Sequence, residues 1–172
     1  HIAPHFLMVE NMQIVYTNIR DAYKNRNEYN IVWQRLIDYV EKNYLTCQEN
    51  RYVSISFDDP TITPLRQCRF YIGMTIKDTV EPKGRFGVMT IPDGEYAVFR
   101  YKGEYSSIYQ LYNDIYMLWL PTSDYQLRNP FSFEVYINTP RDISSSELLT
   151  DVYFPVDKIY PVPPETNKYQ MI

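Results

Sequence analysis

The sequence predicts an α+β fold of two β-α-β-β units, with two antiparallel sheets that are each backed by one helix and a ligand cleft between the halves. Three observations lead to this prediction. Apolar and polar residues alternate strictly from Phe131 to Asn138, as in a strand with one buried face. Two segments, near residues 30–43 and 106–120, repeat their apolar residues at helical spacing. The two halves of the chain also repeat the same order of elements.

The first unit is expected within residues 8–76. Its elements are a strand region at 8–19, a helix that ends near residue 43, and strands at 52–57 and 68–76. Asn27 or Asn30 can cap the helix, because their side chains accept hydrogen bonds from free backbone N–H groups. The loop DDPTITP between the two strands carries turn-forming residues. The first residues, HIAPHF, show no periodicity and are expected to be the remnant of a truncation or a tag.

The second unit is expected within residues 86–156. Its elements are strands at 86–91, 95–101, 131–138 and 148–156, and a helix at 106–120. Pro121 is expected to end the helix, because proline cannot continue the hydrogen-bond ladder. Ser144 and Glu147 have capping-box spacing and predict one short helical turn. The proline-rich tail, YPVPPETNKYQMI, is expected to be extended.

The repeat locates a candidate site. When YVSISFDDP is set against FSFEVYINTP, Ser54 and Ser56 occupy the positions of Glu134 and Tyr136. We expect the apolar side of the 131–138 strand to pack against the helix, so that Glu134 and Tyr136 point the other way. If the two sheets join edge to edge, their uncovered faces form one concave surface, and a pocket is expected there. The default alternative for a carboxylate on the face of a sheet is that Glu134 is a solvated surface residue.

The composition excludes some functions. The net charge is −4 and no Lys/Arg cluster is present, so the chain is not expected to bind DNA by itself. No apolar run has the length of a membrane span, so no membrane partner is expected. The 18 tyrosines suit a binding surface, although a compositional bias of the source organism explains them about equally well. Cys68 lies on the apolar side of its expected strand, and a buried free thiol there favours a cytoplasmic location.

The sequence offers little to conventional enzyme chemistry. The histidines, His1 and His5, lie in the aperiodic first residues, so neither a catalytic triad nor a zinc site is expected. The glycines are scattered and form no phosphate-binding loop, and no cofactor is expected. Asp58 and Asp59 are compatible with an acid/base pair or a cation site, but their place before Pro60 favours a turn.

Six segments carry a resemblance to a known family, in order along nearly the whole chain. They are FDDP at 57–60, CRFYIGMTI at 68–76, IPDGEYAVFRYKGEY at 91–105, YMLWLPTSDY at 116–125, PFSFEVYIN at 130–138 and ELLTDVYFPV at 147–156. Together they resemble the GyrI-like effector-binding domains. That family includes gyrase-inhibitory proteins and the C-terminal halves of AraC-type and MerR-type multidrug-responsive regulators.

The resemblance implies a duplicated SHS2-type β-α-β-β fold over residues 1–172, with repeats at about 8–76 and 86–156. It implies that Glu134 faces the cleft and meets lipophilic cations, with Tyr136 beside it. Trp119 matches an aromatic position at the border of the cleft, although core packing explains this residue as well. FDDP replaces the family's YDDP, so the hydroxyl contact of that tyrosine is missing at Phe57. Further candidates for ligand contact are Tyr16 and Tyr153.

Three functions are compatible with this pattern. The leading hypothesis is the effector-binding domain of a bacterial transcriptional regulator of AraC type, which binds an amphipathic small molecule, including a cationic one. Such a regulator would contact DNA through a helix-turn-helix domain that this chain lacks. The second is a GyrI-like hydrolase of strained cyclopropane-type toxins, in which a carboxylate activates water and a phenol acts as acid. The third is a free-standing protein that resembles gyrase inhibitors and binds another protein.

Overall fold

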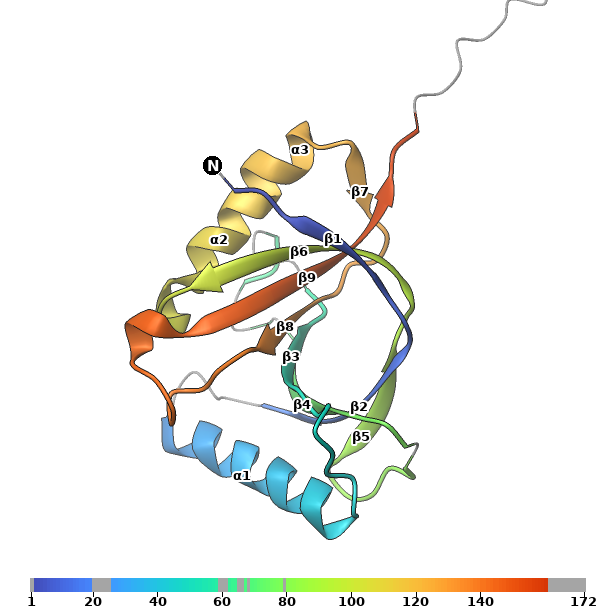
Figure 1. The fold of residues 1–172 in the computed structure, drawn as a ribbon, viewed down its shortest axis with the longest axis vertical. Coiled ribbons are helices and arrows are strands. Elements are labelled where there is room, and N and C mark those ends of the chain that lie inside the picture. Colours follow the sequence, from blue (N-terminus) through green and yellow to red (C-terminus); the bar gives the residue numbers. More distant parts are fainter. Residues whose placement is uncertain are drawn as a thin grey trace, which may run out of the picture.

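The computed structural model describes residues 2–19, 26–58, 62–64, 67, 69–78 and 80–160. One curled antiparallel sheet runs through this part of the chain, and helices lie on its outside (Figure 1). Its strands are β1 (His5–Val9), β2 (Met12–Asn18), β3 (Tyr52–Ser56), β4 (Phe70–Ile76), β5 (Gly87–Ile91), β6 (Gly94–Lys102), β7 (Tyr125–Leu127), β8 (Ser132–Tyr136) and β9 (Leu149–Lys158). They pair in the order β1-β6-β9-β8-β3-β4-β2-β5, and β7 also pairs with β9.

The two sheets expected from the sequence are therefore one. β3 and β8 join the halves, with Ser54 opposite Glu134 in the ladder. A second junction is formed by two pairs of consecutive strands. β1 pairs with β6, and β2, which follows β1, pairs with β5, which precedes β6. The pairing of β3 with β8 has a physical reason. Each would otherwise be an edge strand with a row of unsatisfied backbone groups.

The inner face of the curled sheet is filled by a hydrophobic cluster formed by strands and loops. Phe133 and Val135 of β8 pack there against Ile14, Val53 and Tyr96. The expectation that the apolar side of the β8 strand lies against a helix is therefore wrong, and so is the expectation of a pocket on the concave face. The curl brings the inner faces of both halves together, and their apolar side chains bury one another.

The outer face carries the helices. α1 (Arg26–Lys42) packs through Leu36 and Val40 on β2 and β4, as expected for a helix with one apolar side. The second helical segment runs through η2 (Tyr105–Ser107), α2 (Ile108–Asp114), the π-helix η3 (Ile115–Trp119) and α3 (Leu120–Thr122). Ile115 packs on β6 and β9. Glu134 and Tyr136, on the opposite side of β8 from Phe133, point toward these helices.

Pro121 does not end the second helical segment, which continues to Thr122. Proline has no N–H group and clashes with the preceding turn of a regular α-helix. The wider π-turn of η3 lies directly before Pro121, which is a place where such a distortion is expected. The sequence therefore located the helix correctly and its end two residues too early.

Several smaller expectations are changed by the structure. β1 contains His5 and Phe6, which the sequence analysis treated as aperiodic, and β7 was not expected. The short turn near Ser144 is η4 (Ser145–Glu147), a 3₁₀ turn without a side-chain cap. Asp58 accepts hydrogen bonds from the backbone N–H and the guanidinium of Arg69, at 2.8–3.1 Å. The predictions for Asp59, Pro60, Cys68 and residues 161–172 lie outside the described residues.

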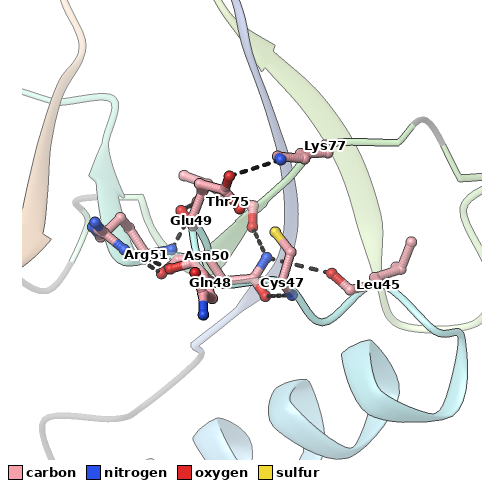
Figure 2. Close-up of polar contacts among 8 residues, drawn as sticks. All are labelled: Leu45, Cys47, Gln48, Glu49, Asn50, Arg51, Thr75 and Lys77. Carbon is pink, nitrogen blue, oxygen red and sulfur yellow. Dashed lines mark hydrogen bonds and ion pairs between the residues drawn. The ribbon is translucent and has the colours of Figure 1, made fainter.

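The loop between α1 and β3 is held in place by Asn50 (Figure 2). The Asn50 Oδ1 atom accepts a hydrogen bond from the backbone N–H of Cys47 at 2.6 Å. Its Nδ2 atom donates to the carbonyl oxygen of Thr75 at 2.6 Å and to that of Leu45 at 3.4 Å. One side chain thus joins the end of α1 to β4. β3 begins two residues after Asn50, at Tyr52.

An aromatic cleft above a buried glutamate

A cleft of about 380 Å³ lies on the helix-bearing face of the sheet. It is bounded by α1 on one side, by Tyr105 of η2 on another, and by the loop that follows β8. The lining residues are Tyr29, Asn30, Trp33, Ile37, Tyr52, Tyr105, Tyr136, Thr139, Pro140, Arg141 and Asp142. Figure 1 shows the loop after β8 passing close to the first turns of α1.

Aromatic rings form the wall of the cleft around Trp33. Its ring meets those of Tyr136, Tyr52 and Tyr29 in edge-to-face contacts, with centroid distances of 6.1, 5.6 and 6.3 Å. Tyr105 meets Tyr136 at 5.4 Å from the other side. Edge-to-face packing leaves ring faces open to a further flat group. The cleft is therefore suited to a ligand with an aromatic or other apolar body.

Glu134 lies beneath this wall. It is not one of the lining residues, but it is two positions before Tyr136 on the same side of β8, and a small part of its surface remains in contact with solvent. Ser54 donates a hydrogen bond from Oγ to Glu134 Oε2 at 3.2 Å, and the Tyr136 hydroxyl donates to Ser54 Oγ at 3.0 Å. The Tyr112 hydroxyl of α2 also hydrogen-bonds to the carboxyl group.

Burial raises the pKa of Glu134 from 4.5 to about 7, because the surrounding rings deprive the charged form of water. The hydrogen bonds from Tyr112 and Ser54 lower this pKa, but they only partly offset the loss of hydration. Within the described residues, no lysine or arginine contributes to this balance. Glu134 is therefore divided between its protonated and charged forms at neutral pH.

The tyrosines around Glu134 stay neutral over the same range. Burial, with the charge of Glu134 as a further cause, raises the pKa of Tyr105 to about 12 and those of Tyr112 and Tyr136 well above 10. The charge of Glu134 also contributes to the raised pKa of Tyr29. Tyr29 and Tyr105 both line the cleft. The negative field of Glu134 therefore reaches the space where a ligand would lie.

One further polar group lies near this cluster. Thr150 of β9 stands opposite Tyr136 in the ladder, so that both side chains lie on the helix-bearing face. Its side chain is fully buried, and Thr150 Oγ1 has no hydrogen-bond partner among the described residues. Buried hydroxyls normally have a partner, from the protein or from water. This end of the site therefore holds an unused hydrogen-bonding group.

Of the residues predicted for the site, Glu134 and Tyr136 lie together, whereas the other four lie away from the cleft. Trp119 packs on Phe99 of β6 and on Tyr125 of β7, with distances of 5.0 and 6.3 Å between ring centroids, which agrees with the core-packing alternative for this residue. Tyr16, Phe57 and Tyr153 lie against the cluster on the inner face of the sheet. There, Tyr153 stacks on Phe133 at 4.6 Å, on the side of β8 away from Glu134.

The helical residues around the cleft and Glu134 were not predicted from the sequence. Tyr29 and Trp33 are four residues apart on α1, and Tyr105 and Tyr112 are seven apart, so each pair lies on one side of its helical segment. These spacings were visible in the sequence. They were not recognised as a sign of a cleft, because an aromatic residue beside an apolar stripe has the same periodicity as the core itself.

Within the described residues, no group of three or more His, Cys, Asp or Glu side chains is placed to hold a metal ion. Among the described helices, none combines the length and the apolar character needed to cross a membrane.

The chain is similar to several solved structures. For EcmrR in its complex with DNA, the TM-score is 0.75 at 19% identity over 91% of this chain, which spans only 57% of that chain. For the EcmrR C-terminal domain, the TM-score is 0.71 at 17% identity, covering 91% and 98% of the two chains. A hydrolase encoded by lin2189 from Listeria innocua gives 0.64 at 13% identity, covering 90% and 91%. SAV2435 bound to tetraphenylphosphonium gives 0.60 at 14% identity, covering 91% and 94%.

At these identities the structural likeness shows a shared fold. The family assignment comes from the sequence, because the model of the GyrI-like small molecule binding domain matches residues 3–157. That match spans β1 to β9 almost completely and confirms the resemblance seen in the six sequence segments. The chain belongs to the family of GyrI-like small-molecule-binding domains.

Proposed function

We propose that this chain is the effector-binding domain of a bacterial transcriptional regulator, and that it binds an amphipathic cation with an aromatic body in the cleft above Glu134. The observation that carries the proposal is Glu134 itself. This carboxylate lies beneath an aromatic wall, its pKa is raised to about 7, and no cationic side chain of the described residues offsets its charge. A ligand that supplies the missing positive charge would bind with a gain that a neutral ligand lacks.

The mechanism follows from the two layers of the site. Trp33, Tyr105 and Tyr136 would stack on the ligand's rings, and cation–π attraction would add to this contact. Glu134 would supply long-range attraction from below the wall, and direct contact if Tyr136 or Tyr105 turns aside. The cation would in turn stabilise the charged form of Glu134 and lower its pKa. SAV2435, of the same fold, has been captured with the lipophilic cation tetraphenylphosphonium, which supports this class of ligand.

The regulatory role is supported by EcmrR, which has been solved on DNA and whose C-terminal domain matches this chain over nearly its full length. In a regulator of this kind, DNA contact would belong to a separate helix-turn-helix domain, and this chain would be the sensor. The AraC type predicted from the sequence is part of this proposal. Two helix-turn-helix motifs encoded next to this domain in its gene would support it, and another type of DNA-binding domain there would refute it.

We also infer that the domain arose by duplication of a β-α-β-β unit. The orders β2-α1-β3-β4 and β6-α2-β8-β9 along the chain support this, because β4 and β9 are both the central strand of their three. The pairing of β3 with β8 supports it as well. Ser54 lies opposite Glu134, as two equivalent residues must where a two-fold axis crosses an antiparallel ladder. Superposition of residues 8–76 on residues 86–156 tests this inference.

Glu134→Gln separates the charge of the residue from its shape. Methyltriphenylphosphonium and triphenylphosphine oxide are a suitable pair of probes, because they have similar size and differ in charge. We expect the substitution to weaken binding of the phosphonium by about 1–3 kcal/mol and to leave the oxide nearly unchanged. Glu10→Gln is the matched control, because Glu10 is exposed between β1 and β2. Calorimetric titration gives all six affinities.

The outcomes of this titration are distinct. Equal losses for both probes would mean that Glu134 only shapes the cleft. Unchanged affinity for both would mean that the ligand binds elsewhere, and the proposal would be wrong.

A second candidate function is hydrolysis of a strained electrophile. It is favoured by the hydrogen bond between Tyr112 and Glu134, which joins a neutral phenol to a carboxyl group that is partly charged at neutral pH. Such a pair suits a general base that activates water and an acid that protonates the leaving group. The fold is shared with the Listeria hydrolase. Turnover of an activated cyclopropane that is lost in both Glu134→Gln and Tyr112→Phe would place this function first.

A further inference from the structure

We propose that the preferred ligand is zwitterionic, with its cationic group toward Glu134 and an anionic group held by Arg141 at the mouth of the cleft. This inference rests on the proposed function and adds the second charge of the ligand. It comes from two opposite charges that are found at different places around the same cleft. Arg141 is one of its lining residues, on the loop after β8, whereas Glu134 lies beneath its inner wall.

The guanidinium of Arg141 is available for such a contact. The side chain is exposed, and its Nη2 atom reaches across to Gln34 Oε1 of α1 at 3.5 Å, which is a long and weak hydrogen bond. Among the described residues it forms no ion pair. Arg141 therefore extends from the loop after β8 toward α1, and the described residues leave most of its donors unused. A carboxylate or a phosphate on the ligand can replace Gln34 as the acceptor and take two donors at once.

Asp142 is the other charged residue among the described residues that line the cleft, and it has a structural role. Its Oδ2 atom accepts a hydrogen bond from the Thr139 hydroxyl at 3.0 Å, and its backbone N–H donates to the Thr139 carbonyl at 3.0 Å. Asp142 thus closes the turn that presents Arg141. Its carboxylate reduces the attraction for an anion at the rim without removing it, because the Arg141 guanidinium extends away from the turn toward α1.

The arrangement also selects against the wrong orientation. An anion placed at the inner end would lie next to Glu134, and the neutral tyrosines there offer no compensating positive charge. A cation placed at the rim would meet Arg141. Both of these arrangements bring like charges together, so Glu134 and Arg141 favour one orientation of a zwitterionic ligand.

Three amines with the same aromatic body test the inference. They are 4′-(aminomethyl)biphenyl-4-carboxylic acid, its methyl ester and 4-phenylbenzylamine, which all carry the cation and differ at the other end. We expect the acid to bind about three- to tenfold more tightly than the ester, the range of a guanidinium–carboxylate pair at a partly exposed site. Arg141→Gln should remove this advantage and leave the ester and the plain amine unchanged. Arg35→Gln, which removes an exposed charge of α1 outside the cleft, is the matched control.

The results separate this inference from the proposed function. If the acid and the ester bind equally to the unmodified protein, or if Arg141→Gln weakens both alike, the anion site is refuted. The proposed function still stands in that case, provided that Glu134→Gln weakens all three amines. If none of the amines binds, or if their binding is indifferent to Glu134→Gln, both ideas are wrong.

Discussion

The raised pKa of Glu134 predicts that this residue makes the folded protein less stable as the pH rises. Its pKa is near 4.5 when the chain is unfolded and about 7 when it is folded. A carboxyl group with a raised folded pKa favours folding in its protonated form. Its contribution is fully present below about pH 4.5 and is lost as the pH rises through about 7. Glu134→Gln stays neutral at every pH, so it should remove this loss.

The size of the effect follows from the two pKa values. One unit of pKa is equivalent to about 1.4 kcal/mol, and the side chain keeps some contact with solvent. We therefore expect the stability of Glu134→Gln relative to the unmodified protein to increase by about 2–3 kcal/mol between pH 5 and pH 8.5. For a domain of this size the corresponding rise in relative Tm is about 4–12 °C. Any fixed cost of the amide cancels, because only the change with pH is used.

Urea unfolding followed by circular dichroism, at a series of pH values, measures this quantity. Glu10→Gln controls for the loss of one negative charge and should follow the unmodified protein. If Glu134→Gln shows the same pH dependence as the unmodified protein, the carboxyl group is well hydrated in the folded state. The argument from its burial would then fail, and with it the main reason for expecting a cationic ligand.

Three further predictions concern the site and the fold. Binding of methyltriphenylphosphonium should release about 0.3–0.8 proton at pH 6 and almost none at pH 8.5, because a charge contribution of about 1–3 kcal/mol lowers the pKa of Glu134 from about 7 in the bound state. Titration in buffers of different ionisation enthalpy measures the release, and uptake of protons would contradict it. Binding of the same probe should change the tryptophan fluorescence through Trp33, so the change should be mostly lost in Trp33→Phe and retained in Trp119→Phe. A change that is retained in Trp33→Phe and lost in Trp119→Phe would place the ligand at Trp119, as predicted from the sequence. Gly94→Ala should cost about 2 kcal/mol or more, because φ is +136° and a Cβ atom would lie 2.7 Å from Arg128 Nη2. Gly84→Ala, with φ at +63° and open space around it, should cost about 1 kcal/mol, and equal costs in urea unfolding would show that the contact with Arg128 adds nothing.

The sequence predicted the elements of the site better than their surroundings. The alternation in FSFEVYIN located the β8 strand and placed Glu134 and Tyr136 on one side of it, because the period of a strand depends only on the backbone. The same alternation cannot say which side faces a helix. Both sides of β8 are covered, the inner one by the hydrophobic cluster and the outer one by α1 and α2, and the assignment made from the sequence was the reverse of the true one.

The aromatic residues show a similar limit. Tyr16, Phe57, Trp119 and Tyr153 resembled ligand contacts, but their rings pack in other clusters. Tyr29, Trp33 and Tyr105 were not among the predicted ligand contacts, but they line the cleft. The same periodicity is compatible with a place in the core and with a place in the wall of a cleft. What separates them is where two helices far apart in the chain lie over the sheet, which no local pattern contains.

By itself, the sequence determined the family, the α+β class, the position of most strands and both helices, and the pairing of a carboxylate with a phenol on one strand. These depend on local periodicity and on motifs, which a chain carries whether or not it is folded. The tertiary structure decided the rest. Closure of one curled sheet buried the inner face of β8 and turned Glu134 toward the helices. The pKa of that residue then depends on rings contributed by α1, η2 and α2, and hydration is lost only when those distant segments meet around it.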